Sequence, residues 1–390
     1  MSTTAHSHAQ DGTLVAPYWP PLTVEEVRDV LPFYPGLAGQ PELLTTSPRP
    51  FSAASVVRIG QRRVFIKRHA HAVRSAASLY EEHAFMAHLR AHGASVPQVL
   101  ANKHGNTAIE INGWTYEVHE LPHGIDLYRD AISWTPFFHA DHAHSAGQAM
   151  AHLHRAAQGY DAPPRTGRPL VASFSIFASK DSGHSVPVYL ATRPALASYL
   201  ASHNWLRDAL DLLRPFHSEL LPLLPQLSPL WTHNDLHPSN LFWSNESAQA
   251  QVTAVIDFGL SDRTNAVHDL AHAIERSMVE WLALVEQPDE PERVAIHFDH
   301  LSAFLNGYES VRPLTNAERA ALAPMTALCH AEFALSEADY FLSVLHSEEE
   351  AYYACPAYLL DHARWWRGAG KQLLDVIRNW DGIQAEAEQQ

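Results

Sequence analysis

The sequence predicts an α+β protein with two lobes, a small β-rich N-terminal lobe and a larger, mostly helical C-terminal lobe. Two observations support this. Short apolar segments with strand character are concentrated in the first 120 of the 390 residues, around one long helix. After Pro122 and Gly124, apolar residues recur at helical spacing instead. We therefore expect the N-terminal lobe over residues 23–121 and the C-terminal lobe over residues 122–390, behind a flexible, proline-rich arm over residues 1–22.

The elements of the N-terminal lobe follow from local patterns. Thr23 and Glu26 form a capping box, so a short helix is expected to begin there. Residues 55–67 (SVVRIGQRRVFIK) are predicted to form two strands around a turn. The apolar spacing over residues 75–92 predicts a helix that Gly93 ends. Further strands are expected over residues 96–100, 107–111 and 114–119.

Helices dominate the C-terminal lobe. Residues 142–157 predict an amphipathic helix, and residues 158–190 predict a long loop of the size of a lid, because they are rich in proline, glycine and serine. A strand–loop–strand unit is expected over residues 230–258. Thr315 and Glu318 form another capping box. The other helices are expected over residues 191–224, 268–286, 294–307, 316–346 and 357–379.

The composition excludes several classes of protein. With 46% hydrophobic and 18% charged residues, the chain is typical of a globular protein, and it has no apolar run near the ~18 residues of a membrane helix. A net charge of −16 argues against nucleic acid as a partner, because phosphates attract basic surfaces. Two cysteines, Cys329 and Cys355, are too few for a disulfide scaffold, and no signal-peptide pattern opens the sequence. We expect a cytoplasmic protein.

The excess of acidic residues lies entirely in residues 231–390, which hold nine basic and 25 acidic residues. Such a field suits a cationic ligand or a metal ion, and a solvated acidic surface is the alternative. Histidine is also frequent, with 27 copies, some of them clustered, as at His139, His142 and His144. The sequence contains neither HExxH nor a paired-cysteine zinc site, so we interpret these histidines as scattered over the surface, with a metal-storing protein as the alternative.

Residues 231–269 carry the chemistry. His233, Asp235 and Asn240 follow a short apolar lead, and Asp257 ends an apolar strand seventeen residues after Asn240. A hairpin of two strands would bring Asn240 and Asp257 to the same edge. Their amide and carboxylate oxygens suit Mg²⁺. Asp235 would then face whatever binds beside the metal, as a base that accepts a proton from a hydroxyl nucleophile.

This segment resembles a known family. HNDLHPSN followed by IDFG is similar to the H-x-D-x-x-x-x-N and IDxG motifs of the aminoglycoside phosphotransferase and choline kinase superfamily, which has a bilobal, protein-kinase-like fold and phosphorylates hydroxyl groups of small molecules with ATP. The resemblance implies that Asp235 is the catalytic base and that Asn240 and Asp257 bind the metal. It gives His233 and Asp269, where a D-L-A motif begins, structural roles beside the site.

The resemblance also assigns nucleotide contacts to the N-terminal lobe. Lys67 ends an apolar strand and matches the lysine that pairs with the ATP phosphates. Glu82 in the following helix is expected to orient Lys67, with Glu81 as the alternative. Residues 116–121 are expected to form the hinge whose backbone binds adenine, and the hinge residues assigned to the nucleotide are Glu117 and His119.

A glycine-rich phosphate loop is expected before Lys67, yet its counterpart over residues 47–55 (SPRPFSAAS) contains no glycine. Backbone amides are expected to hold phosphate there instead. The side chains assigned to assist them are Ser47, Arg49 and Ser52.

The sequence therefore predicts a Mg²⁺- and ATP-dependent phosphotransferase, with GTP as an alternative donor. An amine-bearing acceptor, such as an aminoglycoside or an amino alcohol, fits the acidic charge, and a sugar or homoserine is the alternative. Residues 332–366 mix acidic and aromatic side chains, which predicts either a box for an ammonium group or part of the core.

Two other functions share these motifs. A protein Ser/Thr kinase has the same catalytic residues, but Asp269 follows only twelve residues after Asp257, which leaves no room for a long activation segment. A pseudokinase-type nucleotide-binding module would explain the missing glycines.

Overall fold

The computed structural model describes residues 7–8, 14–15, 17–47 and 49–381. The chain divides into two compact units, the first made of residues 1–123 and 165–168 and the second of residues 124–164 and 169–390. The division falls two residues after the expected boundary behind Leu121. The sequence did not predict that a short piece of the long loop, Arg165–Arg168, belongs to the first unit.

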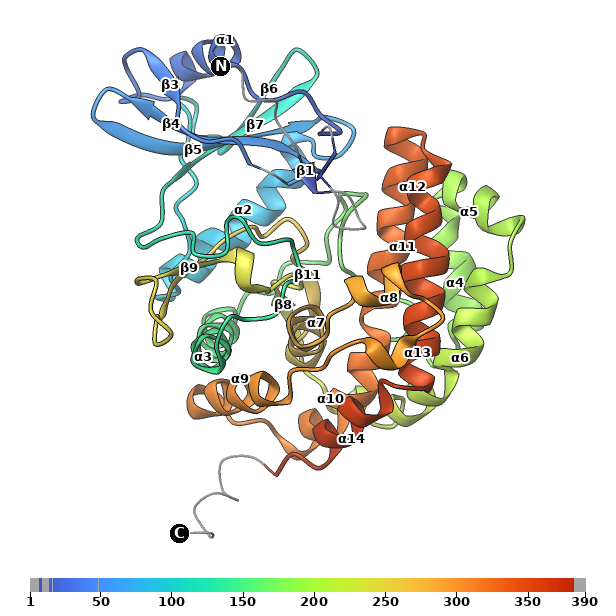
Figure 1. The fold of residues 1–390 in the computed structure, drawn as a ribbon. Coiled ribbons are helices and arrows are strands. Elements are labelled where there is room, and N and C mark those ends of the chain that lie inside the picture. The colour runs from blue at the N-terminus through green and yellow to red at the C-terminus, as the bar shows by residue number, and fades with distance from the viewer. Residues whose placement is uncertain (1–6, 9–13, 16, 48, 382–390) are drawn as a thin grey trace. The chain divides into compact units, whose positions relative to one another are not determined.

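A five-stranded antiparallel sheet with the order β3-β4-β5-β7-β6 forms the centre of the first unit (Figure 1). Its strands are β3 (Pro41–Leu43), β4 (Ala53–Ile59), β5 (Arg62–Ala70), β6 (Ala108–Ile111) and β7 (Trp114–Glu120). The helices of this unit are α1 (Val24–Val30), the 3₁₀ turn η1 (Leu31–Phe33) and α2 (Ala76–Ala91). The capping box of Thr23 and Glu26 is confirmed, and Ser75 caps α2.

Two expectations for the first unit were wrong. Residues 96–100 do not form a strand and contribute a single bridge between Val99 and His119, because Pro97 has no N–H to donate to a ladder. The second concerns the predicted arm over residues 1–22, whose last residues pack against the first unit. Leu22 is buried in the core, and Trp19 packs edge-on against Trp114 with 5.7 Å between ring centroids.

The rest of the predicted arm is described only in part. Strands β1 (Ser7–His8) and β2 (Leu14–Val15) pair with each other in antiparallel register, and residues 1–6, 9–13 and 16 lie outside the described residues.

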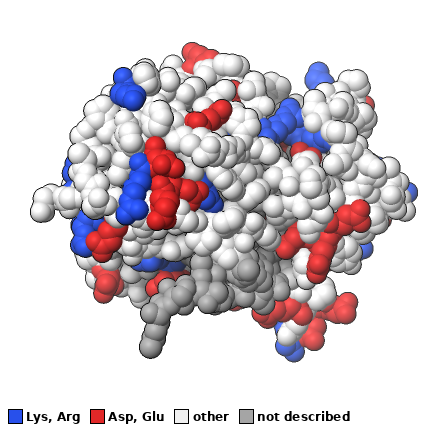
Figure 2. Space-filling view, turned by 90° about the horizontal axis from the view of Figure 1, so that it is seen from above, with Lys and Arg blue, Asp and Glu red and all other residues white. Residues whose placement is uncertain are grey.

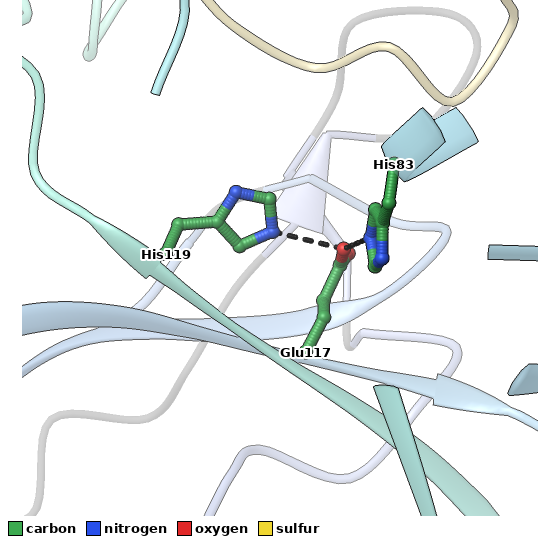
Figure 3. Close-up of side chains that lie close together, drawn as sticks. All are labelled: His83, Glu117 and His119. Carbon is green, nitrogen blue, oxygen red and sulfur yellow. Dashed lines mark hydrogen bonds and ion pairs between the residues drawn. The ribbon is translucent and has the colours of Figure 1, made fainter. Parts of the chain in front are cut away.

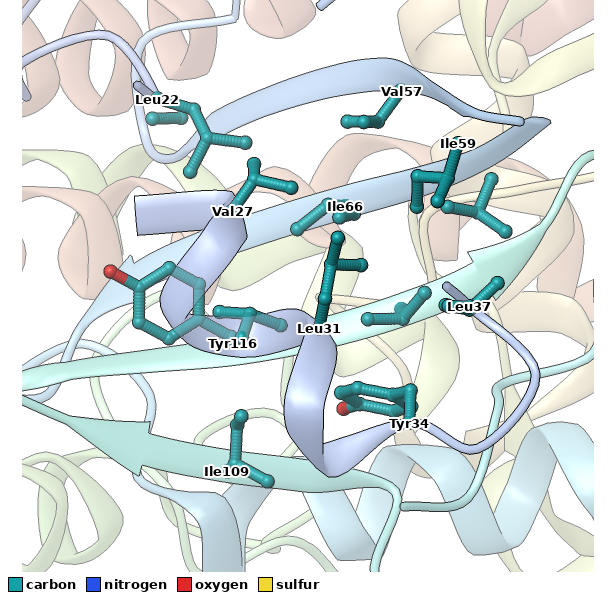
Figure 4. Packing of buried hydrophobic residues seen from close by; sticks show 14 residues of the cluster. Leu22, Val27, Leu31, Tyr34, Leu37, Val57, Ile59, Ile66, Ile109 and Tyr116 are labelled. Carbon is teal, nitrogen blue, oxygen red and sulfur yellow. The ribbon is translucent and has the colours of Figure 1, made fainter. Parts of the chain in front are cut away.

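The core of the first unit lies between α1 and one face of the sheet (Figure 4). In β5 the buried Val64 and Ile66 alternate with less buried residues, which is the pattern of a strand with one face toward the core. Val27 and Leu31 come from the helical side, and Tyr116 comes from β7. Apolar burial on both sides therefore fixes how α1 packs on the sheet.

The second unit is mostly helical (Figure 1). Its helices are α3 (Ala140–Ala156), α4 (Ser182–Ala191), α5 (Pro194–Ala201), α6 (Trp205–Leu220), α7 (Ala266–Met278), α8 (Leu282–Glu286), α9 (Phe298–Val311), α10 (Asn316–Leu328), α11 (His330–Tyr340), α12 (Glu348–Tyr352), α13 (His362–Arg367) and α14 (Lys371–Arg378). Shorter helical segments are η2 (Leu224–Gln226), η3 (Pro238–Asn240), η4 (Pro291–Arg293), η5 (Phe341–Leu345) and η6 (Tyr353–Asp361). The single helix predicted over residues 316–346 is thus divided into α10, α11 and η5, while its capping box is confirmed.

Helices α3 and α9 pack with their backbones in direct contact. A Cβ atom at Gly147 of α3 would lie 2.0 Å from the carbonyl oxygen of Phe304, and one at Gly307 of α9 would lie 2.0 Å from that of His144. No side chain fits at such a distance. The two glycines therefore set the separation of these helices.

Four short strands of the second unit form two antiparallel ladders, β8 (Pro229–Thr232) with β11 (Asp262–Asn265) and β9 (Leu241–Trp243) with β10 (Val252–Val255). The second ladder is the predicted hairpin, with Leu241 opposite Val255. Strand β11 was not predicted, because its sequence, DRTN, is short and polar. The ladders place the loops after β8 and after β10 next to each other, since the amide of Ile256 donates to the carbonyl of Asn240 at 2.9 Å.

The charged side chains seen in Figure 2 lie on the surface, whereas many histidines lie inside the protein. One face of the molecule shows small groups of acidic and basic side chains beside each other on a largely uncharged surface (Figure 2). Many histidines are buried, among them His142, His154, His330 and His362, so our expectation of scattered surface histidines was wrong for these residues. Every helix in the described part of the chain is too short or too polar to span a bilayer.

Candidate active site

The loop after β8 carries the residues of the first motif. Asn234 lies in the left-handed region with φ of +60°, a conformation that asparagine tolerates better than most residues. Its side chain holds this turn, because Oδ1 accepts hydrogen bonds from Oγ1 of Thr232 at 2.8 Å and of Thr264 at 3.2 Å. Asp235 follows directly. The β8–β11 ladder thus positions the loop through side-chain contacts as well as backbone pairing.

Asp269, in the first turn of α7, binds the backbone of the same loop. Its carboxylate accepts hydrogen bonds from the amides of His233 at 3.0 Å and Asn234 at 2.7 Å, and lies 2.9 Å from Nε2 of His154. Burial alone would raise the pKa of Asp269, but these hydrogen bonds and the nearby histidines lower it to about 2. Asp269 is therefore a buried carboxylate whose oxygens are occupied by the backbone of the loop.

His233 links the loop to the end of β10. Its Nε2 donates to the carbonyl of Ile256 at 2.9 Å, and its Nδ1 accepts from the amide of Asp235 at 3.2 Å. Burial lowers the pKa of His233. The ring is accordingly neutral at pH 7, and both nitrogens are used to hold the two halves of the motif together.

The carboxylate of Asp235 is fixed by two neighbours, while its side chain keeps 16% exposure. Nδ2 of Asn240 donates to the backbone carbonyl of Asp235 at 2.8 Å and to its Oδ2 at 3.2 Å. The guanidinium of Arg276, on α7, forms an ion pair with Oδ1. Asp235 is thus held in one orientation at the end of the loop.

Asn240 and Asp257 have the chemistry of a magnesium site. Because the Nδ2 group of Asn240 donates to Asp235, its amide oxygen points away from Asp235, and an amide oxygen is of the kind that Mg²⁺ binds. Asp257 follows Ile256, whose amide bonds the carbonyl of Asn240, and has a left-handed φ of +59°. The two candidate ligands therefore emerge from adjacent backbone positions, and their oxygens fit a hard cation.

Arg276 is a site residue that the sequence analysis missed. It is almost fully buried, and its guanidinium carbon lies 4.5 Å from the ring centroid of Phe333 and 5.5 Å from that of Trp134. Burial lowers the pKa of Arg276 to about 10, so it stays charged at pH 7. Among the described residues, its Nε and Nη2 have no hydrogen-bond partner. An arginine at helical spacing gives no signal in sequence that distinguishes it from a solvated one.

In the first unit, Lys67 lies in the middle of the sheet, on β5, opposite Ala54 and Glu117 on the neighbouring strands. Glu82, on α2, is buried and lies 3.4 Å from Nη2 of Arg165. Glu81 accepts hydrogen bonds from the amide and hydroxyl of Thr166. Both candidate carboxylates of α2 therefore contact the segment 165–168, which the sequence did not place there.

The expected hinge over residues 116–121 is wrong as local structure, because Trp114–Glu120 is strand β7. Its backbone is paired with β5 on one side, and on the other the amide of Leu100 donates to Val118 at 2.7 Å and that of Glu120 to Gln98 at 2.9 Å. The backbone groups of residues 116–120 are thus engaged within the sheet. The side chain of His119 is directed to Glu117 instead (Figure 3).

Glu117 is the centre of a buried histidine cluster. Its carboxylate oxygens lie 2.9 Å from Nε2 of His69, 2.7 Å from Nε2 of His83 and 2.8 Å from Nε2 of His119. Although burial alone would raise the pKa of Glu117, the three histidines lower it well below its usual value. Figure 3 shows His83 on α2 and His119 on β7 pointing to the same carboxylate, so the cluster ties the helix to the sheet.

The glycine-free loop joins β3 to β4, and Pro48 within it lies outside the described residues. The amide of Ser47 donates to Ala54 at 2.9 Å, and Oγ of Ser47 accepts from the amide of Arg49 at 3.3 Å. Ser52 precedes β4 directly. Two amides of this loop are thus engaged within the protein, and the assignment of Ser47, Arg49 and Ser52 to phosphate remains a prediction.

The acidic and aromatic residues of 332–366 are dispersed. Glu332 caps the backbone amides of Ser175 and Ile176, each at 2.6 Å. Trp365 and Trp366 pack against Trp281 in the core. Of the aromatic residues in this range, Phe333 packs against Arg276, the partner of Asp235.

With this geometry established, the chain can be compared with known proteins. The profile of the family described as "Phosphotransferase enzyme family" (APH) matches residues 48–314. The chain therefore belongs to this family, and the predicted class of enzyme, a phosphotransferase, is confirmed.

The curated relatives are named homoserine kinase. One, of Rhodopseudomonas palustris (strain BisB5), is 26% identical over 264 residues, which cover 66% of this chain and 67% of that protein. Another, of Xanthobacter autotrophicus (strain ATCC BAA-1158 / Py2), is 29% identical over 241 residues and 61% of each chain. The match thus leaves a third or more of each relative uncovered.

Solved structures resemble the whole chain. A microcompartment-associated aminopropanol kinase matches 91% of this chain and 99% of its own, with a TM-score of 0.58 and 19% identity. An amicoumacin kinase in complex with AMP-PNP, Ca²⁺ and Ami matches 91% and 94%, with a TM-score of 0.55 and 16% identity. At such identities the likeness shows the fold alone, and it confirms the predicted protein-kinase-like fold.

Proposed function

We propose that the protein is a Mg²⁺- and ATP-dependent kinase that phosphorylates a hydroxyl group of a small molecule, with Asp235 as the catalytic base. The observation that carries this proposal is the fixed carboxylate of Asp235. Asp269 holds the two preceding residues through their amides, His233 accepts from the amide of Asp235, and Asn240 orients its side chain. A carboxylate held in this way can align an acceptor hydroxyl and accept its proton during in-line attack on the γ-phosphoryl group.

The other residues of the motifs have roles that follow from their chemistry. Asn240 and Asp257 would hold the metal ion, which offsets the negative charge of the phosphate oxygens. Lys67 would pair with the same phosphates from the first unit. Glu82 has Arg165 as a neighbour, so its expected role in orienting Lys67 would be shared with that arginine.

For the acceptor, we favour a hydroxy amino acid of the homoserine type. The curated relatives carry the name homoserine kinase. Arg276 adds a physical reason, because it offers a buried guanidinium beside Asp235 with donors that have no partner among the described residues. A guanidinium binds a carboxylate through paired N–H groups. The amine-bearing acceptors that the acidic charge favours, amino alcohols and aminoglycosides, are the competing class.

The test is ADP release from Mg²⁺-ATP with a panel of acceptors: homoserine, aminopropanol, ethanolamine, choline, an aminoglycoside, a sugar and a generic protein. We expect homoserine to stimulate ADP release in the wild type, and Asp235→Asn to lower turnover by about 10²–10⁴-fold, the usual contribution of a general base. Asp211→Asn, at an exposed carboxylate of α6, is the matched control.

Retained turnover in Asp235→Asn would overturn the assignment of the base. Stimulation by an amino alcohol or an aminoglycoside, and not by homoserine, would replace the acceptor class and keep the kinase. If no acceptor acts and Mg²⁺-ATP does not raise the melting temperature, the pseudokinase alternative without nucleotide turnover replaces the proposal.

A further inference from the structure

A second group of titratable side chains lies in the second unit next to Arg276, and it contains none of the residues assigned to catalysis or to magnesium above. Glu275 of α7, His330 of α11 and His362 of α13 each direct one ligand atom to a common point, and these atoms lie within 4.8 Å of one another. All three side chains are buried, with at most 5% exposure. The kinase reaction proposed above gives this cluster no role.

The hydrogen bonding of the cluster is incomplete. Both ring nitrogens of His330 and of His362, and Oε2 of Glu275, have no hydrogen-bond partner in the described part of the chain. Leaving a buried polar atom without a partner costs about 1–3 kcal/mol. Five such atoms in one place point to a partner other than the described side chains.

Comparison with the Glu117 cluster of the first unit shows what kind of partner fits. There, three histidine nitrogens lie 2.7, 2.8 and 2.9 Å from the carboxylate, so histidine and glutamate satisfy each other directly. Here, Oε1 of Glu275 lies 3.3 Å from Nδ1 of His330 and 3.7 Å from Nδ1 of His362. Neither pair forms a hydrogen bond, so histidine and glutamate do not satisfy each other here.

The two distances from Oε1 of Glu275 are close to those between ligands around a tetrahedral metal ion. Zn²⁺ binds histidine nitrogen and carboxylate oxygen at about 2.0–2.1 Å, which places neighbouring ligand atoms roughly 3.3 Å apart. Burial lowers the pKa of His330 to about 3 and that of His362 well below its usual value, so both rings are neutral at pH 7 and can ligate. His362 is held in place by stacking on Trp281 with 3.8 Å between ring centroids.

We propose that Glu275, His330 and His362 bind a divalent transition-metal ion, of the Zn²⁺ type, as a structural cross-link of α7, α11 and α13. Two histidines and one carboxylate select zinc-type ions rather than Mg²⁺, which prefers oxygen ligands only. Water completes the coordination. The site joins segments more than thirty residues apart in sequence. The metal ion stabilises the folded protein because it binds the folded and not the unfolded chain.

The test uses the full-length protein after removal of metal with a chelator, followed by one molar equivalent of Co²⁺, which reports a four-coordinate site by intense visible absorption. We expect one Co²⁺ per chain with these bands, and a melting temperature higher by a few degrees with Zn²⁺, about what a site filled well above its Kd provides. His330→Gln and His362→Gln are expected to lose the bands and the shift.

Because the chain holds 27 histidines, the controls are His119→Gln in the Glu117 cluster and His297→Gln on the surface, which are expected to keep the bands. Bands that persist in His330→Gln and His362→Gln would overturn the proposal, as would their absence in the wild type. If the histidine variants do not fold, Glu275→Gln, which keeps the volume of the side chain, replaces them. If Co²⁺ bands are absent and His330→Gln and His362→Gln instead lose the stabilisation that the acceptor gives the wild type, the cluster belongs to acceptor binding and the metal proposal is overturned.

Discussion

Asp269 offers the sharpest test of how the second unit holds the loop that carries Asp235. Replacing it by asparagine keeps the shape of the side chain but removes the charge that His154 and the amides of His233 and Asn234 stabilise. The shift of its pKa from 3.8 to about 2 corresponds to about 2–3 kcal/mol of folding free energy at pH 7. The new amide group also faces an N–H donor, which adds about 1–3 kcal/mol for an unsatisfied buried group.

We therefore expect Asp269→Asn to lower the free energy of unfolding by about 3–5 kcal/mol, the range for removing one partner of a buried pair. The measurement is urea unfolding at pH 7, followed by tryptophan fluorescence, with Asp211→Asn as the exposed control. Since the folded-state pKa lies below the unfolded value, the stabilisation is complete above the unfolded pKa and declines as pH falls through 3.8 toward 2. The difference between wild type and variant should therefore be constant from pH 8 to pH 6 and shrink in acid.

A loss within about 0.5 kcal/mol, the range of an ordinary surface substitution, would refute this reasoning. So would a difference that grows toward acidic pH, because it would mean that the carboxylate is not the stabilised form.

Three further predictions follow from the same structure. Arg276→Lys should lower turnover at least about tenfold, because a single ammonium cannot pair with Asp235 and stack on Phe333 as a planar guanidinium does. The control is Arg378→Lys on the surface, where the guanidinium pairs with Glu219 at 3.0 Å. This variant should leave turnover unchanged in the same assay. Gly307→Ala should lower the melting temperature by several degrees, because the added methyl meets a backbone carbonyl at 2.0 Å and helices α3 and α9 have to separate, and unchanged melting would show that they adjust freely. Glu117→Gln should lower the free energy of unfolding at pH 7 by about 2–4 kcal/mol, because charge-assisted hydrogen bonds to three histidines are lost. The effect of Glu117→Gln should decline in acid, because the pKa of Glu117 is lowered. Glu120→Gln is the exposed control.

The parts of the fold that the sequence predicted are those with a strong local signal. The capping boxes at Thr23 and Thr315 and the hairpin of β9 and β10 follow from patterns within a few residues. The same holds for the catalytic motif, because His233, Asp235 and Asn240 lie within eight residues of one another. Local patterns record local structure, and this part of the site is local.

The parts that the sequence did not predict depend on contacts between distant residues. Strand β11 is polar and becomes a strand only by pairing with β8. From the sequence alone, Arg276 cannot be distinguished from a solvent-exposed arginine on a helix, because only the fold buries it beside Asp235. The histidine cluster was also missed, because a glutamate in a strand gives no sign that His69, His83 and His119 will surround it.

Helix α7 has a consequence for how the protein loses activity. All thirteen of its residues are buried, and it carries Asp269, Arg276 and a residue of the inferred metal site. A helix with no solvent-facing side cannot fray or open by itself, since any opening breaks buried contacts on every face. Its amide protons should therefore exchange with solvent only when the whole second unit unfolds. Heating should then abolish catalysis in one step, at the unfolding of that unit, without an earlier stage in which the fold survives and the catalytic loop is already loose.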